Sequence, residues 1–105
     1  MTFKLEKANE TLRELVASFV LHESNGASLI TVTHLIVVPS LTVATVFISV
    51  YPENKEIEAL DFLKRKAGEL RKYVTSRIKM RKIPSFEFVI DKGEKNRQRI
   101  DELTK

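Results

Sequence analysis

The chain has 105 residues, of which 43% are hydrophobic and 30% are charged, and its formal net charge is +4. A chain of this size fits one hydrophobic core, and its aliphatic content excludes a largely disordered protein. Because cysteine is absent, disulfide bonds and thiolate metal sites are also excluded.

The first element, from about Thr2 to Ser24, is predicted to be a helix. Its apolar residues recur at spacings of three and four, as in Leu12, Val16 and Phe19. This spacing is typical of a helix with one apolar face. Asn25-Gly26 supplies the stop signal.

Two β-branched runs follow, from Ser28 to Val38 and from Leu41 to Tyr51. Pro39-Ser40 between them is the expected turn of an antiparallel hairpin. Together they make up most of the longest uncharged stretch, Ala27 to Pro52, which we interpret as strands and not as a membrane span, because threonines and His34 interrupt it. The charged N-terminus does not have the pattern of a signal peptide, so a soluble, cytoplasmic protein is expected.

From about Asn54, apolar residues again follow helical spacing as far as Ile78. Gly68 weakens the pattern, because glycine is about 1 kcal/mol less favourable than alanine inside a helix. We therefore predict two helices joined by a kink at Gly68. After Ile83-Pro84, the stretch SFEFVID alternates apolar and polar residues, which predicts a third strand.

The predicted order is therefore α-β-β-α-α-β, an α+β fold with helices packed on one face of a three-stranded sheet. We expect residues 1–92 to form a single domain. Residues 93–105 are expected to form a polar C-terminal tail, with or without a short helix.

The excess positive charge lies in one segment, residues 64–83, which carries nine basic residues and one acidic residue. An ordinary solvated helix face has mixed charge, whereas cations this close together repel unless a polyanion neutralises them. At helical spacing, Arg65, Lys72 and Lys79 fall near one side, opposite the apolar residues. The segment therefore predicts nucleic-acid binding.

Gly68 has two interpretations that stay open. Close helix packing or an ordinary turn would each explain a glycine at this position. Alternatively, the break exposes a new helix N-terminus that a phosphate approaches without meeting a β-carbon. Few aromatic residues are available for stacking, so recognition of phosphates and shape is expected in place of base stacking on the sheet.

Catalysis and metal binding are not expected from this sequence. His22 and His34 are the only histidines, and neither has a serine or carboxylate at a nucleophile or metal-ligand spacing. The acidic residues between Glu53 and Asp61 lie at the start of a predicted helix, where carboxylates complement the helix dipole.

Several short motifs resemble those of bacterial ribosome-binding factor A, a family with a type II KH-like fold. The most specific is RKIPSFEFVID, from Arg81 to Asp91. The others are Thr31-Val32-Thr33, Ala44 with Val46-Phe47-Ile48-Ser49, Gly68 with Leu70-Arg71, and Arg99-Ile100-Asp101 with Leu103. The chain resembles a divergent member, because Lys66 stands where the family's Ala-x-Gly kink begins with alanine.

The resemblance implies a ribosome biogenesis factor that binds 16S rRNA in immature 30S subunits. It would assist late small-subunit maturation and rRNA processing. It would also support growth in the cold. Expected partners are small-subunit rRNA and the 30S precursor, with no membrane, cofactor or small-molecule substrate, and the chain is expected to be a monomer. A KH-like module for another RNA or DNA, and a basic protein-interaction domain, stay open as alternatives.

The basic segment supplies the expected contact surface for that RNA. The expected RNA-binding residues are Lys64, Arg65, Lys66, Gly68, Arg71, Lys72, Arg77, Lys79, Arg81 and Lys82. Tyr73 is an additional candidate contact.

Overall fold

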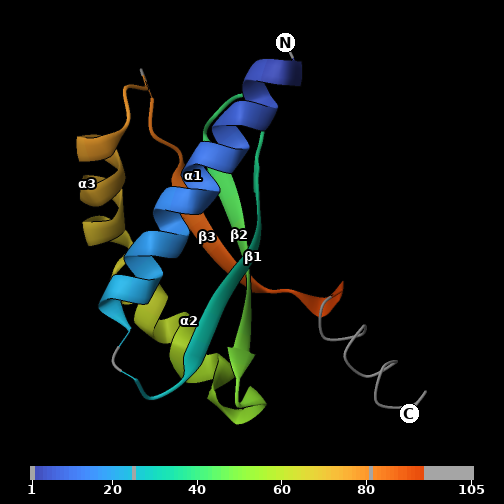
Figure 1. Cartoon of the computed structure of the whole chain (residues 1–105), viewed down its shortest axis with the longest axis vertical. Coiled ribbons are helices and arrows are strands. Elements are labelled where there is room, and N and C mark those ends of the chain that lie inside the picture. Colours follow the sequence, from blue (N-terminus) through green and yellow to red (C-terminus); the bar gives the residue numbers. More distant parts are fainter. Residues whose placement is uncertain (1, 25, 81, 94–105) are drawn as a thin grey trace.

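The computed structural model describes residues 2–24, 26–80 and 82–93. In these residues the order is α1 (Thr2–Glu23), β1 (Leu29–Val37), β2 (Val43–Tyr51), the 3-10 turn η1 (Glu53–Lys55), α2 (Glu56–Arg65), α3 (Ala67–Arg77) and β3 (Ser85–Ile90) (Figure 1). The predicted α+β fold and its element order are confirmed. The predicted tail, residues 93–105, lies outside the described residues apart from Gly93.

The sheet has the strand order β1-β2-β3. β1 and β2 form the predicted antiparallel hairpin, and in its turn the Leu41 N–H donates to the Val38 carbonyl at 2.8 Å. β3 pairs with β2 in parallel. A parallel pair needs a long crossover connection, and α2 and α3 provide it.

Helices cover one face of this sheet. Along β2, Ala44, Val46, Ile48 and Val50 are buried, whereas the residues between them are half-buried. This alternation is expected when one face of a sheet meets a core and the other does not. Asp91, just after β3, has a carboxylate oxygen 2.5 Å from the hydroxyl of Thr33 in the middle of β1, which links the end of β3 to the other outer strand.

α1 packs along β1 through its apolar face. Leu12, Val16 and Val20 on this face are buried. A polar contact adds to this packing, because the side-chain oxygen of Asn9 accepts a hydrogen bond from the backbone N–H of Val37 at 2.9 Å. α1 is thus fixed to the last residue of β1 as well as to the core.

α2 and α3 meet at Lys66, two residues before the predicted kink at Gly68. The N–H of Lys66 donates to the carbonyls of Phe62 and Leu63, both at 3.1 Å, and its own carbonyl accepts from the N–H of Leu70 at 2.9 Å. With ψ near 2°, this residue ends one helix and begins the next. We call residues 65–67 the elbow.

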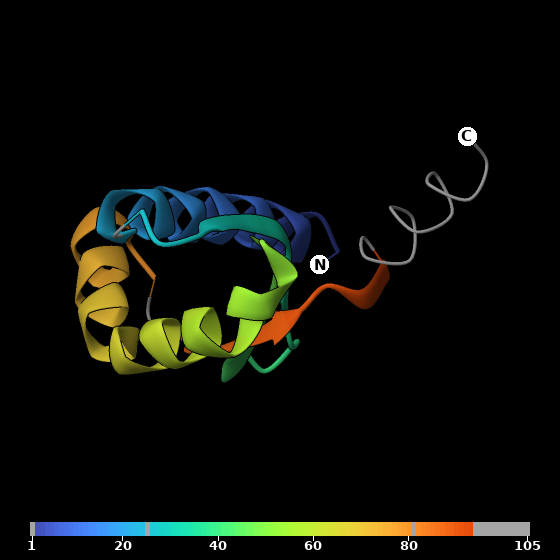
Figure 2. The ribbon, with the colours of Figure 1, turned by 90° about the horizontal axis from the view of Figure 1, so that it is seen from below.

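The elbow lets the two helices pack on different partners. α2 packs against β2 and β3, while α3 packs mainly against α1 and also contacts β3. Seen end-on, α3 stands between the far end of α2 and α1 (Figure 2). A single straight helix would follow only one of these directions, so tertiary packing explains the break.

Candidate nucleic-acid interface

The sequence-predicted RNA-binding residues lie on α2, on the elbow, on α3 and in the segment after α3. The exposed members on the two helices are Lys64, Arg65, Gly68, Arg71, Lys72 and Arg77. Lys79 and Lys82 are exposed in residues 78–84, and Arg81 lies outside the described residues. We call the exposed cations of this set the basic surface.

The predicted alignment of Arg65, Lys72 and Lys79 on one helix side is wrong. Arg65 ends α2, Lys72 lies on α3, and Lys79 follows the end of α3 at Arg77. Ile78 already has extended backbone angles, with φ −136° and ψ 140°. A single helical projection therefore does not describe residues that lie on three differently directed segments.

The exposed side of α3 contains a shallow hollow of about 430 Å³. Its lining residues are Gly68, Arg71, Lys72, Thr75 and Ser76. The two hydroxyl groups already bond to the helix backbone, Thr75 to the carbonyl of Arg71 and Ser76 to that of Tyr73. The surface of the hollow itself is mostly apolar, and the cations of Arg71 and Lys72 border it.

Gly68 is the second residue of α3, where backbone N–H groups lack partners within the helix and the dipole is positive. A β-carbon built on Gly68 would have no atom within 4 Å, and its φ is not in the left-handed region. Neither close packing nor a turn therefore requires glycine here. The interpretation that phosphate approaches the backbone at this point stays a prediction.

Lys66 differs from the other predicted ligands because it is already paired. Its ammonium lies 3.6 Å from a carboxylate oxygen of Glu23 at the end of α1, and 3.4 Å from one of Glu69. It also lies 5.9 Å from the centre of the Phe62 ring. Its contacts connect the elbow to α1, so in this structure Lys66 is a positioning residue of the elbow.

Tyr73 and Arg77 lie on the side of α3 that faces α1. The Tyr73 ring packs edge-on against Phe19, with centroids 5.4 Å apart, and its hydroxyl lies 3.2 Å from that of Ser18. The Arg77 guanidinium stacks on the same ring at 3.7 Å. The ring that sequence reasoning offered as an RNA contact is thus occupied by packing between helices. Arg77 itself is exposed, and its Nη1 donates to the Tyr73 carbonyl and to the Ser76 hydroxyl.

Residues considered for catalysis or metal binding are dispersed. Within the part of the chain that the structure describes, no group of three or more His, Cys, Asp or Glu side chains could hold a metal ion. Glu56 and Glu58 lie in the first turn of α2, as expected for carboxylates that complement the helix dipole. His34 is exposed on the uncovered sheet face, 5.7 Å from the ring of Phe47.

Comparison with known proteins gives the family. Residues 4–104 match the family model of ribosome-binding factor A. The chain belongs to this family. The ribosome-binding factor A of Opitutus terrae is 36% identical over 102 residues, covering 95% of this chain and 84% of the relative. That of Chlorobaculum parvum is 35% identical over 109 residues, covering 100% of this chain and 91% of the relative.

Solved structures of ribosome-binding factor A share the fold. A crystal structure of the Thermus thermophilus protein aligns with a TM-score of 0.75 at 23% identity, over 82% of this chain and 93% of that chain. A homology model of the Thermus thermophilus protein, fitted into a cryo-electron microscopy map of its complex with the 30S subunit, aligns with a TM-score of 0.67 at 23% identity, over 77% and 88% of the two chains.

No helix among the described residues of this ribosome-binding factor A family member is long and apolar enough to cross a membrane. The stretch between Ala27 and Pro52 forms β1 and β2, as predicted. Sequence reasoning missed the pairing of Lys66 with Glu23, because their separation along the chain gives no signal that they meet. It likewise missed the packing of Tyr73 on α1.

Proposed function

We propose that this ribosome-binding factor A family member binds 16S rRNA in immature 30S subunits. It assists late small-subunit maturation and processing of that rRNA, and it acts in the cytoplasm as a monomer. Support comes from family membership and from the 30S complex of the Thermus thermophilus relative. The observation that carries the proposal is the charge of residues 64–83, where nine of ten charged residues are cations.

Within this proposal, the exposed cations on both sides of the elbow are the main phosphate ligands. Arg65 ends α2, and Arg71 and Lys72 border the hollow on α3. The other proposed ligands on this surface are Lys64, Arg77, Lys79 and Lys82. Arg81, which lies outside the described residues, is proposed as a further ligand, whereas Lys66 positions the elbow. Gly68 leaves the first turn of α3 open, so that a phosphate can reach its backbone N–H groups.

The mechanism is binding, with residues 1–92 as the proposed RNA-binding unit and no covalent step. Phosphate contacts provide affinity and fix orientation, but they carry no base identity. The fold presents its cations on a bent surface, so a matching bend in the RNA backbone would place several phosphates in contact at once. Selectivity for immature subunits then comes from RNA shape, which changes as the subunit matures.

Sedimentation with ribosomal particles tests this proposal. The protein is mixed with immature 30S subunits, with mature 30S subunits or with 70S ribosomes, and each mixture is separated on a sucrose gradient. We expect the protein to sediment with immature 30S subunits and to be absent from the 70S fraction. Equal binding to all particles and to an unrelated RNA of similar length would instead favour the general nucleic-acid-binding module.

A further inference from the structure

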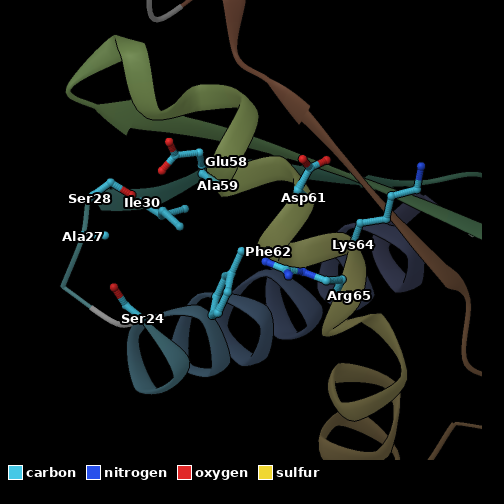
Figure 3. Close-up of a pocket in the computed structure, with 10 residues that line it drawn as sticks. All are labelled: Ser24, Ala27, Ser28, Ile30, Glu58, Ala59, Asp61, Phe62, Lys64 and Arg65. Atoms are coloured by element: carbon cyan, nitrogen blue, oxygen red, sulfur yellow. The ribbon is translucent and has the colours of Figure 1, made fainter.

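A pocket of about 490 Å³ lies beside the basic surface, between the end of α1, the turn into β1 and one side of α2 (Figure 3). Residues from α2 that line it include Glu58, Asp61, Phe62 and Arg65, and residues from the turn include Ser24 and Ser28. Its volume lies within the range of about 300–1,000 Å³ that is usual for ligand pockets.

Phe62 forms an aromatic wall of this pocket. The side chain reaches from α2 toward the last turn of α1, and Arg65 directs its guanidinium back toward it (Figure 3). The ring is half-buried and packs partly against the core, and Lys66 lies 5.9 Å from its centre. Since Lys66 is tied to Glu23, the elbow holds this ring in place next to α1.

The charge along the pocket changes sign from one end of α2 to the other. Glu58, Phe62 and Arg65 are spaced four and three residues apart, so they lie on the same face of the helix. Glu58, whose exposed carboxylate lies 3.5 Å from the ammonium of Lys55, is at one end of this face. Phe62 lies in the middle with Asp61 beside it, and Arg65 lies at the end that joins the basic surface. A nucleotide has the matching polarity, with an anionic phosphate at one end and base N–H donors at the other.

We propose that this pocket binds one unpaired nucleotide of the RNA that the basic surface holds. The base stacks on Phe62, the phosphate lies toward Arg65, and the carboxylates of Glu58 and Asp61 accept hydrogen bonds from the exocyclic amino group of the base. This inference rests on the proposed function and adds base preference to it. Adenine, cytosine and guanine carry that amino group, whereas uracil has the carbonyl oxygen O4 where cytosine has its amino group, and the carboxylates repel this oxygen.

Fluorescence anisotropy with labelled octanucleotides of adenine, cytosine or uracil tests the base preference. The wild-type chain should bind the adenine and cytosine oligonucleotides at least about fivefold more tightly than the uracil one, which is the lower end for one specific base contact. In the double variant Glu58→Gln with Asp61→Asn, the ratio of the affinity for adenine or cytosine oligonucleotides to that for the uracil one should fall to about one. Glu10→Gln with Glu14→Gln, two exposed residues of α1, should keep the wild-type ratio. The ratio is the readout, because a change in net charge affects all three oligonucleotides alike.

Phe62→Leu tests the stacking contact while leaving an apolar side chain against the core. It should weaken binding of the adenine and cytosine oligonucleotides by about tenfold, as expected for one lost base–aromatic stack. Phe47→Leu, on the uncovered sheet face, is the matched control and should leave affinity unchanged. Thermal unfolding followed by circular dichroism identifies any variant that does not fold. If Phe62→Leu does not fold, the double variant at the exposed residues Glu58 and Asp61 tests the pocket proposal alone.

Two results would overturn the inference in distinguishable ways. If the wild-type chain binds RNA but neither pocket variant changes base preference or affinity, the pocket proposal fails and the proposed function stands. If the wild-type chain binds neither these oligonucleotides nor small subunits, the proposed function fails and the pocket proposal fails with it.

Discussion

Gly68 shows how a residue that looks like a helix breaker can be part of a helix. It lies in the first turn of α3, has no left-handed φ, and leaves open space where a β-carbon would stand. Gly26 is a contrasting case, because its φ of 82° lies in the region that side chains disfavour.

Replacement of Gly68 with alanine is therefore expected to raise the free energy of unfolding, by a few tenths to about 1 kcal/mol, because the unfolded chain loses freedom. Binding to 16S rRNA should nevertheless weaken, because the new methyl group covers the backbone of the hollow. Urea unfolding and RNA titration measure the two effects. Gly26→Ala is the control and should lower stability by about 1 kcal/mol without affecting RNA affinity. Unchanged RNA affinity in Gly68→Ala would remove Gly68 from the proposed site.

Lys66 and Lys72 provide a second comparison between single residues. Lys66 pairs with Glu23 and Glu69, whereas Lys72 is exposed beside the hollow on α3. For single-stranded RNA, the slope of log affinity against log salt changes by about 0.7 for each phosphate contact. Lys72→Ala should reduce the slope by about this amount, and Lys66→Ala should leave it nearly unchanged. A larger change in slope for Lys66→Ala than for Lys72→Ala would show that Lys66 exchanges its carboxylate partners for phosphate.

At the scale of elements, the contact between α1 and β1 depends on more than the apolar face. The side-chain oxygen of Asn9 accepts a hydrogen bond from the backbone N–H of Val37 in a partly buried position. Asn9→Ala should lower the free energy of unfolding by about 1–3 kcal/mol, because the N–H loses its acceptor. Asn9→Asp retains an oxygen acceptor and should cost less than Asn9→Ala. Denaturant unfolding monitored by circular dichroism measures both, and equal stability of Asn9→Ala and the wild type would contradict this role.

The existence and order of the elements were predictable because each has a strong local pattern. Apolar spacing identified α1, β-branched runs around Pro39-Ser40 identified the hairpin, and alternation after Pro84 identified β3. The position of the elbow was not predictable. Lysine is common in helices, so Lys66 gives no signal of a break in the sequence. The break occurs there because α3 turns away to pack on α1.

For the whole molecule, the sequence located the basic surface but not its shape. The charge excess in residues 64–83 is visible in the chain itself, whereas the bend that separates Arg65 from Lys72 depends on the elbow. The pocket was also invisible, because residues from distant parts of the chain line it together, such as Ser24 and Ser28 with Glu58 and Phe62. Surfaces formed by one continuous segment could be predicted here, and surfaces formed by two could not.

The central claim is that cations around the elbow, and not positive charge in general, bind rRNA of the small subunit. Arg71→Glu with Lys72→Glu reverses two exposed charges on α3, and Lys7→Glu with Lys92→Glu reverses two exposed charges elsewhere. Both variants change the net charge equally, so a general charge effect would weaken both to the same extent.

The most direct measurement is the affinity of both variants for immature 30S subunits at one fixed salt concentration, with folding checked by circular dichroism. We predict that the α3 variant loses binding by at least about a hundredfold, since two phosphate contacts become two repulsions, and that the control variant binds within about threefold of the wild type. Equal affinities for the two variants would contradict the account.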